Sequence, residues 1–236
     1  MTQPTDTGDE GARAYRFLAE RDPVLAALTR THGHPDPYAW HDGGRTGTSL
    51  FAALLLHVVG QRVSAAAAFT VYDRIAQATG GGVPNPGAVL ALRAEGLRVL
   101  GTTGGKADCA VALARHQVER TMPLDDLRGL DDDAVIRALT SVKGLGAWSA
   151  QAFLMRQLHR PDVLPATDSQ LRRAVQAHWA LATAPTHGQL RERAQAWSPH
   201  RSHAAALLWA SLHPPDEPFD PKERALAALA ARQARP

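Results

Sequence analysis

A glycine pair and one carboxylate are the residues of this chain whose types and spacing point most directly to chemistry. Gly144 and Gly146 flank Leu145 and stand directly before an apolar segment. Because glycine has no Cβ, such a turn can bring backbone N–H groups against another surface, and a helix start adds unpaired N–H donors and a partial positive charge. This arrangement suits an anion such as phosphate. Asp168 follows at the start of the next predicted helix. The pattern therefore combines a candidate phosphate-binding turn with a single carboxylate.

The composition favours helices that could position these residues. Of the 236 residues, 44% are hydrophobic and only 6% are aromatic, and alanine and leucine outnumber β-branched residues, which favours helices over sheets. We expect an all-α fold of about ten helices. The predicted helices cover residues 12–20, 23–31, 49–59, 65–78, 86–94, 106–119, 132–141, 147–159, 169–178, 187–197 and 199–212, with a last alanine-rich helix after Pro221.

The predicted helices divide into two lobes. The apolar helices at 49–59 and 147–159 are expected to anchor lobe 1, about residues 50–163, and the two ends of the chain to form lobe 2, about residues 12–49 and 164–236. A cleft is expected between the lobes. Residues 1–11 are polar and acidic, and we expect a disordered tail there.

Several classes of protein are disfavoured by the sequence. The richest apolar run, Leu50 to Leu56, ends at His57 and is too short to cross a bilayer. The N-terminus resembles neither a signal peptide nor a basic transit peptide, so we expect a cytoplasmic, bacterial protein with no membrane partner. The single cysteine, Cys109, excludes an internal disulfide and a four-cysteine zinc or iron–sulfur site.

The charge gives mild support for a polyanionic partner. The net charge is +3 and the isoelectric point is about 9.4. Lys106, Lys143 and Lys222 are the three lysines among 26 basic residues, so arginine dominates. A GC-rich genome and phosphate contact explain that preference equally well.

Several motifs in order resemble the helix-hairpin-helix DNA glycosylase superfamily, and within it the 3-methyladenine DNA glycosylase II family. The resemblance runs from about Leu50 to Leu212. It implies an all-α fold with a helix-hairpin-helix motif and a DNA-binding cleft. Many members carry an additional N-terminal β-domain, but we expect none here, because the residues before Leu50 are too few and too helical for one. The matching segments are 51–54, 59–64, 104–107, the hairpin at 142–150, 164–168, and 197–203 with Trp209.

The resemblance implies a monofunctional DNA glycosylase that flips and hydrolytically excises alkylated purines of the 3-methyladenine and 7-methylguanine type in base excision repair. Its partner would be double-stranded DNA at the nucleoid, and it would act as a monomer without an organic cofactor. Asp168 matches the family's catalytic carboxylate, which would stabilise positive charge on the sugar and orient the attacking water. Asp168 also suits a helix N-cap, and both roles are compatible.

Trp148 indicates the reaction subtype. Related enzymes that also cut the strand resemble this sequence but carry a lysine at this position as a Schiff-base nucleophile, so Trp148 implies simple hydrolysis. Trp148 and Trp209 match positions that line the family's base pocket, where an indole face attracts a cationic alkylated purine; the alternative for each is a core residue. Ala152 stands where better-known relatives have tyrosine, which implies a wider, less aromatic pocket.

DNA contacts are also implied by the resemblance. Gln61 and Arg62 match the loop that fills the gap left by an extruded base, and a surface arginine in a turn is the alternative for Arg62. Lys143, where the family usually has proline, is assigned a phosphate contact rather than a catalytic amine. The predicted DNA-binding residues are Gln61, Arg62, Lys143, Gly144, Gly146, Ser149 and Arg201. A monovalent cation, Na⁺ or K⁺, would bind the backbone carbonyls of Thr140, Val142 and Leu145.

Two other functions compete with this interpretation. A non-catalytic helix-hairpin-helix protein would bind damaged DNA and release no base; Asp168 at the family's catalytic position argues against it. An oxidised-base glycosylase with lyase activity would form a covalent adduct with DNA; Trp148 in place of lysine argues against it. The preferred lesion is left open by the sequence.

Overall fold

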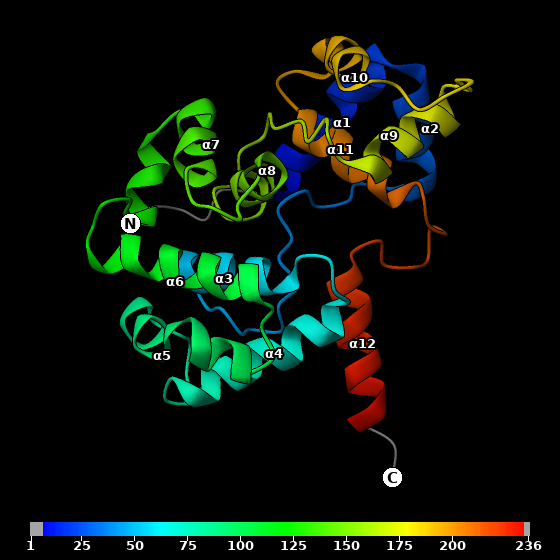
Figure 1. The fold of residues 1–236 in the computed structure, drawn as a ribbon. Coiled ribbons are helices and arrows are strands. Elements are labelled where there is room, and N and C mark those ends of the chain that lie inside the picture. Colours follow the sequence, from blue (N-terminus) through cyan, green and yellow to red (C-terminus); the bar gives the residue numbers. More distant parts are fainter. Residues whose placement is uncertain (1–6, 234–236) are drawn as a thin grey trace, which may run out of the picture. The chain divides into compact units, whose positions relative to one another are not determined.

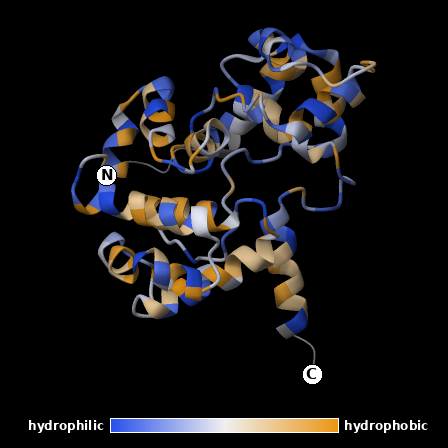
Figure 2. Cartoon of the chain, viewed as in Figure 1, coloured by the Kyte–Doolittle hydropathy of each residue, from blue (hydrophilic) through white to orange (hydrophobic). Residues whose placement is uncertain are grey.

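The computed structural model describes residues 7–233, and every regular element in that range is a helix (Figure 1). This confirms the predicted all-α class. Apolar and polar residues share most of the helices (Figure 2), as expected for helices that bury one face. The elements are α1 (Thr7–Arg21), α2 (Pro23–His32), α3 (Leu50–Gly60), α4 (Ala65–Ala78), α5 (Pro86–Val99), α6 (Gly104–Val118), η1 (Leu124–Gly129), α7 (Asp132–Thr140), α8 (Ala147–Arg156), α9 (Ser169–His178), α10 (His187–Arg193), η2 (Ala194–Trp197), α11 (Arg201–Ala210) and α12 (Pro221–Gln233).

The chain forms two compact units. Unit 1 contains the described residues up to Ala39 together with Leu154–Phe219, and unit 2 contains Trp40–Phe153 together with the described residues from Asp220 onward. The boundary after Phe153 falls inside α8. The predicted lobes placed the boundaries about ten residues later and assigned the C-terminal helix to the lobe of the chain ends, whereas α12 packs against α4 in unit 2.

Local sequence signals set the helix starts. Ser64, Asn85 and Asp131 each accept a hydrogen bond from a backbone N–H in the first turn of the following helix, at 3.2, 2.9 and 2.7 Å. These side chains satisfy N–H groups that have no partner within a helix. These caps define where α4, α5 and α7 begin, and Pro86 occupies the first turn of α5, where its missing N–H costs nothing.

Several predicted bounds were wrong. α1 begins at Thr7, so residues 7–11 are helical rather than disordered, whereas residues 1–6 of the expected tail lie outside the described residues. The packing of Ala14, Tyr15 and Leu18 in the core of unit 1 stabilises this helix. α5 continues to Val99 across a kink at Arg93, whose φ is +57°. The helix predicted at 187–197 ends its α-helical part at Arg193 and continues as η2.

In unit 2, α3 forms the centre of the core. Nine of its eleven residues are buried, and it packs against α4 and α6. Of the residues from Leu50 to Val59, only His57 is polar. α3 therefore places its C-terminal turn, with Gln61 and Arg62 directly after it, on a rigid support.

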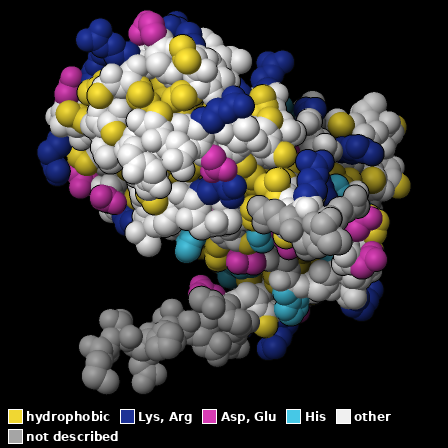
Figure 3. Space-filling model, turned by 90° about the horizontal axis from the view of Figure 1, so that it is seen from below, with side chains coloured by type: hydrophobic (Ala, Val, Ile, Leu, Met, Phe, Trp, Pro, Cys, Tyr) yellow, Lys and Arg dark blue, Asp and Glu magenta, His cyan; other side chains and the backbone are white. Residues whose placement is uncertain are grey.

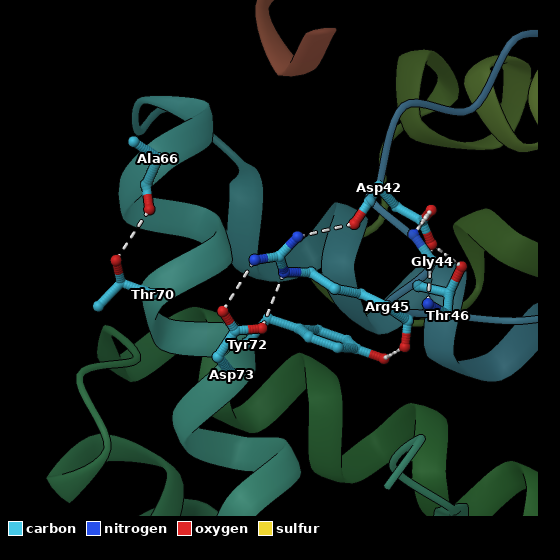
Figure 4. A network of polar contacts seen from close by, with 8 residues as sticks. All are labelled: Asp42, Gly44, Arg45, Thr46, Ala66, Thr70, Tyr72 and Asp73. Atoms are coloured by element: carbon cyan, nitrogen blue, oxygen red, sulfur yellow. Dashed lines mark hydrogen bonds and ion pairs between the residues drawn. The ribbon is translucent and has the colours of Figure 1, made fainter. Parts of the chain in front are cut away.

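The loop before α3 is fixed by a polar network (Figure 4). The carboxylate of Asp42 accepts hydrogen bonds from the N–H of Gly44 at 2.9 Å and of Thr46 at 2.7 Å, and also from the Thr46 hydroxyl. The Arg45 guanidinium forms two hydrogen bonds with Asp73 of α4, at 2.8 and 3.0 Å. The Tyr72 hydroxyl donates to the Arg45 carbonyl at 3.2 Å. The network joins this loop to α4, and Ser49 then caps the start of α3 by accepting the Ala52 N–H at 3.1 Å.

Unit 1 is built around α11. Its residues Ser202 to Leu208 are buried, and it packs against α1, α2 and α9. The fully buried Trp197 donates from its indole nitrogen to Asp22 at 3.2 Å, and Asp22 also caps α2. α9 packs against α11, which places Asp168 at the start of α9 close to Trp209 on α11.

None of the helices within residues 7–233 combines the length and the hydrophobicity that crossing a membrane requires. Lys and Arg side chains are scattered over the face drawn in Figure 3, with acidic side chains between them, rather than gathered in one large patch.

Candidate active site

Asp168 of unit 1 caps α9. Its backbone is extended (φ −66°, ψ 125°), and its Oδ1 accepts the Leu171 N–H at 2.7 Å. The same oxygen accepts a second hydrogen bond, from the indole Nε1–H of Trp209 at 3.1 Å. The side chain is half-buried. Two donors on one oxygen fix the direction of the carboxylate, so the predicted cap is confirmed and an additional partner is found.

Trp209 therefore has a contact that sequence reasoning missed. The prediction placed Trp209 in a base pocket through its ring face, but its N–H is bound to Asp168, 41 residues earlier in the chain. No spacing rule links two such positions, because the contact depends on how α9 and α11 pack. Trp209 is half-buried and orients the carboxylate.

Arg201, a predicted DNA contact, lies at the start of α11 and forms an ion pair with Asp162. Its Nε and Nη2 atoms donate to the two oxygens of Asp162, each at 2.7 Å, and Ser198 donates to the same carboxylate at 2.8 Å. Burial raises the pKa of Asp162, but the hydrogen bonds from Arg201 and Ser198 outweigh it and lower the pKa below its ordinary value. In this geometry Arg201 joins the loop before α9 to α11.

In unit 2, the hairpin between α7 and α8 depends on Gly144. Its φ is +102°, and a Cβ at this position would lie 2.9 Å from Cβ and 3.1 Å from Sγ of the buried Cys109. Any side chain would be both strained and overpacked there. Gly146 has open space around the position of a Cβ. The two glycines therefore differ: Gly144 permits the hairpin to approach α6, and Gly146 has no such packing requirement.

Gln61 braces the hairpin from the end of α3. Its side-chain amide donates to the Gly144 carbonyl at 3.1 Å and approaches the Ser149 hydroxyl at 3.4 Å. Ser149 is buried, with 5% of its surface exposed. The structure thus brings together three of the predicted DNA-binding residues, and it gives Gln61 and Ser149 partners within the protein.

A groove of about 760 Å³ lies beside the hairpin within unit 2. The exposed Arg62 contributes to it from a left-handed backbone conformation (φ +58°), which is uncommon for a residue with a side chain. Lys106 donates to the Val59 carbonyl at 2.9 Å, and burial lowers its pKa. The groove therefore has a cationic lining next to the hairpin that is predicted to bind phosphate. Its lining residues are Gln61, Arg62, Val63, Thr103, Gly105, Lys106, Asp108, Ala112, Lys143 and Gly144.

Trp148, at the start of α8, is 43% exposed although it is a large aromatic residue. Its indole stacks on the imidazole of His57, with ring centroids 5.3 Å apart and planes inclined by 26°. Burial, followed by the charge of Lys222, lowers the pKa of His57 to about 3, so the imidazole is neutral at pH 7. Ala152 follows one turn later on α8 and is half-buried. The core alternative therefore does not describe Trp148.

No cluster of three or more His, Cys, Asp or Glu side chains suited to a metal ion occurs among residues 7–233. At the hairpin, the Thr140 hydroxyl donates back to the Ile136 carbonyl at 2.7 Å, and the Val142 carbonyl accepts the Leu145 N–H at 3.0 Å. Any cation at the predicted site would therefore depend on backbone carbonyls alone.

Comparison with known proteins identifies the family. The sequence profile of the HhH-GPD superfamily of base excision DNA repair proteins matches residues 56–200, which is more than half of the chain. The chain belongs to this superfamily. The matched range contains the hairpin, Trp148 and Asp168, so the resemblance inferred from the motifs is confirmed.

This HhH-GPD protein is similar in sequence to two relatives that are named as DNA-3-methyladenine glycosylases. A *Bacillus subtilis* protein named putative DNA-3-methyladenine glycosylase YfjP is 28% identical over 170 residues, 70% of this chain and 59% of that protein. DNA-3-methyladenine glycosylase 1 of *Schizosaccharomyces pombe* is 26% identical over 161 residues, 67% of this chain and 71% of the yeast protein. The match thus spans less than two thirds of the *B. subtilis* protein.

A solved structure shares the fold of this HhH-GPD protein. The *S. pombe* 3-methyladenine DNA glycosylase Mag1, in complex with abasic DNA, superimposes with a TM-score of 0.72 at 23% sequence identity. The superposition covers 87% of this chain and all of the Mag1 chain. At this level of identity the likeness concerns the fold.

Proposed function

We propose that this HhH-GPD protein is a monofunctional DNA glycosylase that removes alkylated purines by hydrolysis. The observation that carries the proposal is the oriented carboxylate of Asp168, held by the Leu171 and Trp209 N–H groups in a family of base excision repair proteins. The products would be a free purine and an abasic site. Trp148 at the hairpin favours hydrolysis, because an indole cannot form a Schiff base with the sugar.

Asp168 would act on the sugar. Breaking the bond between C1′ and the base develops positive charge on the deoxyribose, which a nearby carboxylate stabilises. The same carboxylate would orient a water molecule and take its proton as the oxygen bonds to C1′, while the bonding electron pair leaves with the base. Asp168 belongs to unit 1 and Trp148 to unit 2.

Double-stranded DNA would be held by the hairpin and by the cationic groove beside it. Backbone N–H groups of the hairpin suit a phosphate, and Arg62 and Lys143 add positive charge along the groove. Arg62, exposed at the tip of the turn after α3, would fill the gap left by the extruded base. A Na⁺ or K⁺ ion on the carbonyls of Thr140, Val142 and Leu145 would strengthen the phosphate contact, and no organic cofactor would be needed.

The exposed indole of Trp148 and the names of the relatives both support alkylated purines as the lesion class. A purine alkylated at a ring nitrogen is cationic, and an electron-rich indole face attracts a cation by about 0.5–2 kcal/mol. Relatives named for 3-methyladenine in *B. subtilis* and *S. pombe* support the same class. Ala152 would leave room for more than one lesion. We propose that the protein works as a monomer on chromosomal DNA in the bacterial cytoplasm, at the nucleoid.

Base release from methylated duplex DNA by the purified protein tests this function. Asp168→Asn keeps the shape and the N-cap but removes the charge, so release of 7-methylguanine should fall by at least about a hundredfold. Affinity for abasic DNA should remain. Asp131→Asn is the matched control, because Asp131 caps α7 through the same kind of bond at 2.7 Å without a proposed role in chemistry.

Three outcomes would refute parts of the proposal. A wild-type protein that binds damaged duplexes and releases no base would be a damage-binding protein. Equal activity of Asp168→Asn and the wild type would remove the carboxylate from the mechanism. A DNA adduct trapped by borohydride would indicate a lyase.

A further inference from the structure

His57 is a polar residue in the apolar helix α3 of unit 2, where an apolar side chain would be expected. His57 is the only polar residue between Leu50 and Val59 of α3, where every neighbour in sequence is apolar and buried. Its Nε2 is buried without a hydrogen-bond partner among the described residues. Leaving such a group unsatisfied costs free energy that an apolar side chain would avoid.

His57 has one distinctive contact, the stacked indole of Trp148. The rings lie 5.3 Å apart between centroids and are inclined by 26°. The indole is 43% exposed, whereas His57 is half-buried and its Nε2 atom is shielded from solvent. Stacked aromatic rings restrict each other's orientation, and the support comes from α3, the most buried helix of unit 2.

We propose that His57 is a positioning residue for base recognition, which holds the Trp148 indole as a platform for a cationic base. This inference rests on the proposed function and adds a residue to the recognition of its substrate. An uncharged ring beneath the indole leaves the exposed face electron-rich. A cation in the same place would compete for that face and repel a cationic base.

The surroundings keep the imidazole uncharged. Burial lowers the pKa of His57, and the positive charge of Lys222 lowers it further. Lys222 itself lies over the Trp40 ring, with its Nζ 3.6 Å from the ring centroid. The His57 imidazole therefore stays neutral at pH 7.

Three substitutions separate ring, volume and charge. His57→Phe keeps a stacked neutral ring, His57→Leu keeps an apolar side chain without a ring, and His57→Lys places a charge beneath the indole. Release of 7-methylguanine is measured under single-turnover conditions, and affinity is measured for a duplex with an abasic site, which offers no base to the platform.

We expect His57→Phe to release 7-methylguanine as the wild type does. His57→Leu and His57→Lys should each be slower by about 3- to 30-fold, the range of a cation–π contact, with unchanged affinity for abasic DNA. In a Trp148→Ala background, neither substitution should slow release further, because His57 acts through the indole. His57→Leu suits the apolar α3 and keeps the test valid if the lysine variant does not fold.

Equal rates for the Phe and Leu variants would overturn the inference, and so would a parallel loss of abasic-DNA affinity, since general damage to unit 2 would cause it. Additive losses in the Trp148→Ala background would also overturn it. A wild-type protein that releases no base would instead refute the proposed function.

Discussion

The indole N–H of Trp209 donates a hydrogen bond to Oδ1 of Asp168 at 3.1 Å, and the same oxygen accepts the Leu171 N–H at 2.7 Å. The cap alone would fix one direction of the carboxylate. The second donor comes from α11, a different helix, and so ties the orientation of Asp168 to the packing of unit 1.

Trp209→Phe tests whether this bond matters for catalysis. The substitution keeps an aromatic ring but removes the N–H donor, so Asp168 keeps its cap and loses its second contact. A hydrogen bond to a charged group contributes about 1.5–3 kcal/mol, and we expect single-turnover base release to slow by about 10- to 100-fold. Affinity for abasic DNA should be unchanged.

Trp179→Phe is the matched control for that variant. Trp179 lies in the same unit, where its ring packs against Trp197 at 5.8 Å and beneath Arg193. If Trp179→Phe slowed base release as much as Trp209→Phe does, the effect would reflect the general stability of unit 1 rather than the orientation of Asp168.

Local features of the site could be predicted from the sequence, and contacts between distant segments could not. The caps at Ser64, Asp131 and Asp168 follow from residues within one helical turn. The Trp209–Asp168 bond and the His57–Trp148 stack join different helices. Periodicity and spacing contain no information about which of many polar or aromatic residues meet when helices pack.

The predicted roles of Gln61 and Arg201 show the same limit. The motif positions predicted that both residues contact DNA, but motifs do not reveal which partners a side chain has inside the protein. In the structure, Gln61 donates to the Gly144 carbonyl and Arg201 pairs with Asp162. The end of α1 nearest the N-terminus was missed for a related reason, since composition alone suggested disorder there.

The two hairpin glycines should respond differently to substitution. Gly144→Ala places a Cβ 2.9 Å from Cys109 Cβ in a backbone conformation that favours glycine, and we expect it to destabilise the protein by roughly 2–5 kcal/mol. Gly146→Ala meets open space and should leave the stability within about 0.5 kcal/mol of the wild type. Urea denaturation of the three proteins measures this. Similar losses for both variants would contradict the packing of Gly144 on α6.

The cationic groove predicts how DNA affinity depends on salt. Arg62 and Lys143 both line the groove, and each phosphate contact contributes about 0.9 to the slope of log affinity against log salt. Replacing either residue with alanine should weaken binding and reduce that slope by about 0.9. Arg115→Ala, an exposed arginine of α6 outside the groove, serves as the control. An unchanged slope in both groove variants would place the phosphates elsewhere.

The stability of unit 1 should fall in mild acid because of His203. This side chain is 3% exposed and lies edge-on to the rings of Tyr15 and Tyr38. Burial and the nearby His200 lower its pKa to about 4, against a smaller opposing effect of Asp36. The folded protein therefore binds fewer protons than the unfolded chain between pH 6.5 and 4.

The direction in which stability changes with pH follows from this difference in bound protons. The contribution of His203 to stability is complete above pH 6.5 and is lost as the pH falls toward 4, by roughly 2 kcal/mol between pH 6.5 and pH 5. His203→Phe keeps an aromatic ring among the tyrosines and should lose correspondingly less stability over that interval in urea denaturation. His187→Phe, at an exposed position on α10, should retain the wild-type dependence on pH. If His203→Phe and the wild type lost stability in parallel, the acid sensitivity would have to come from other groups.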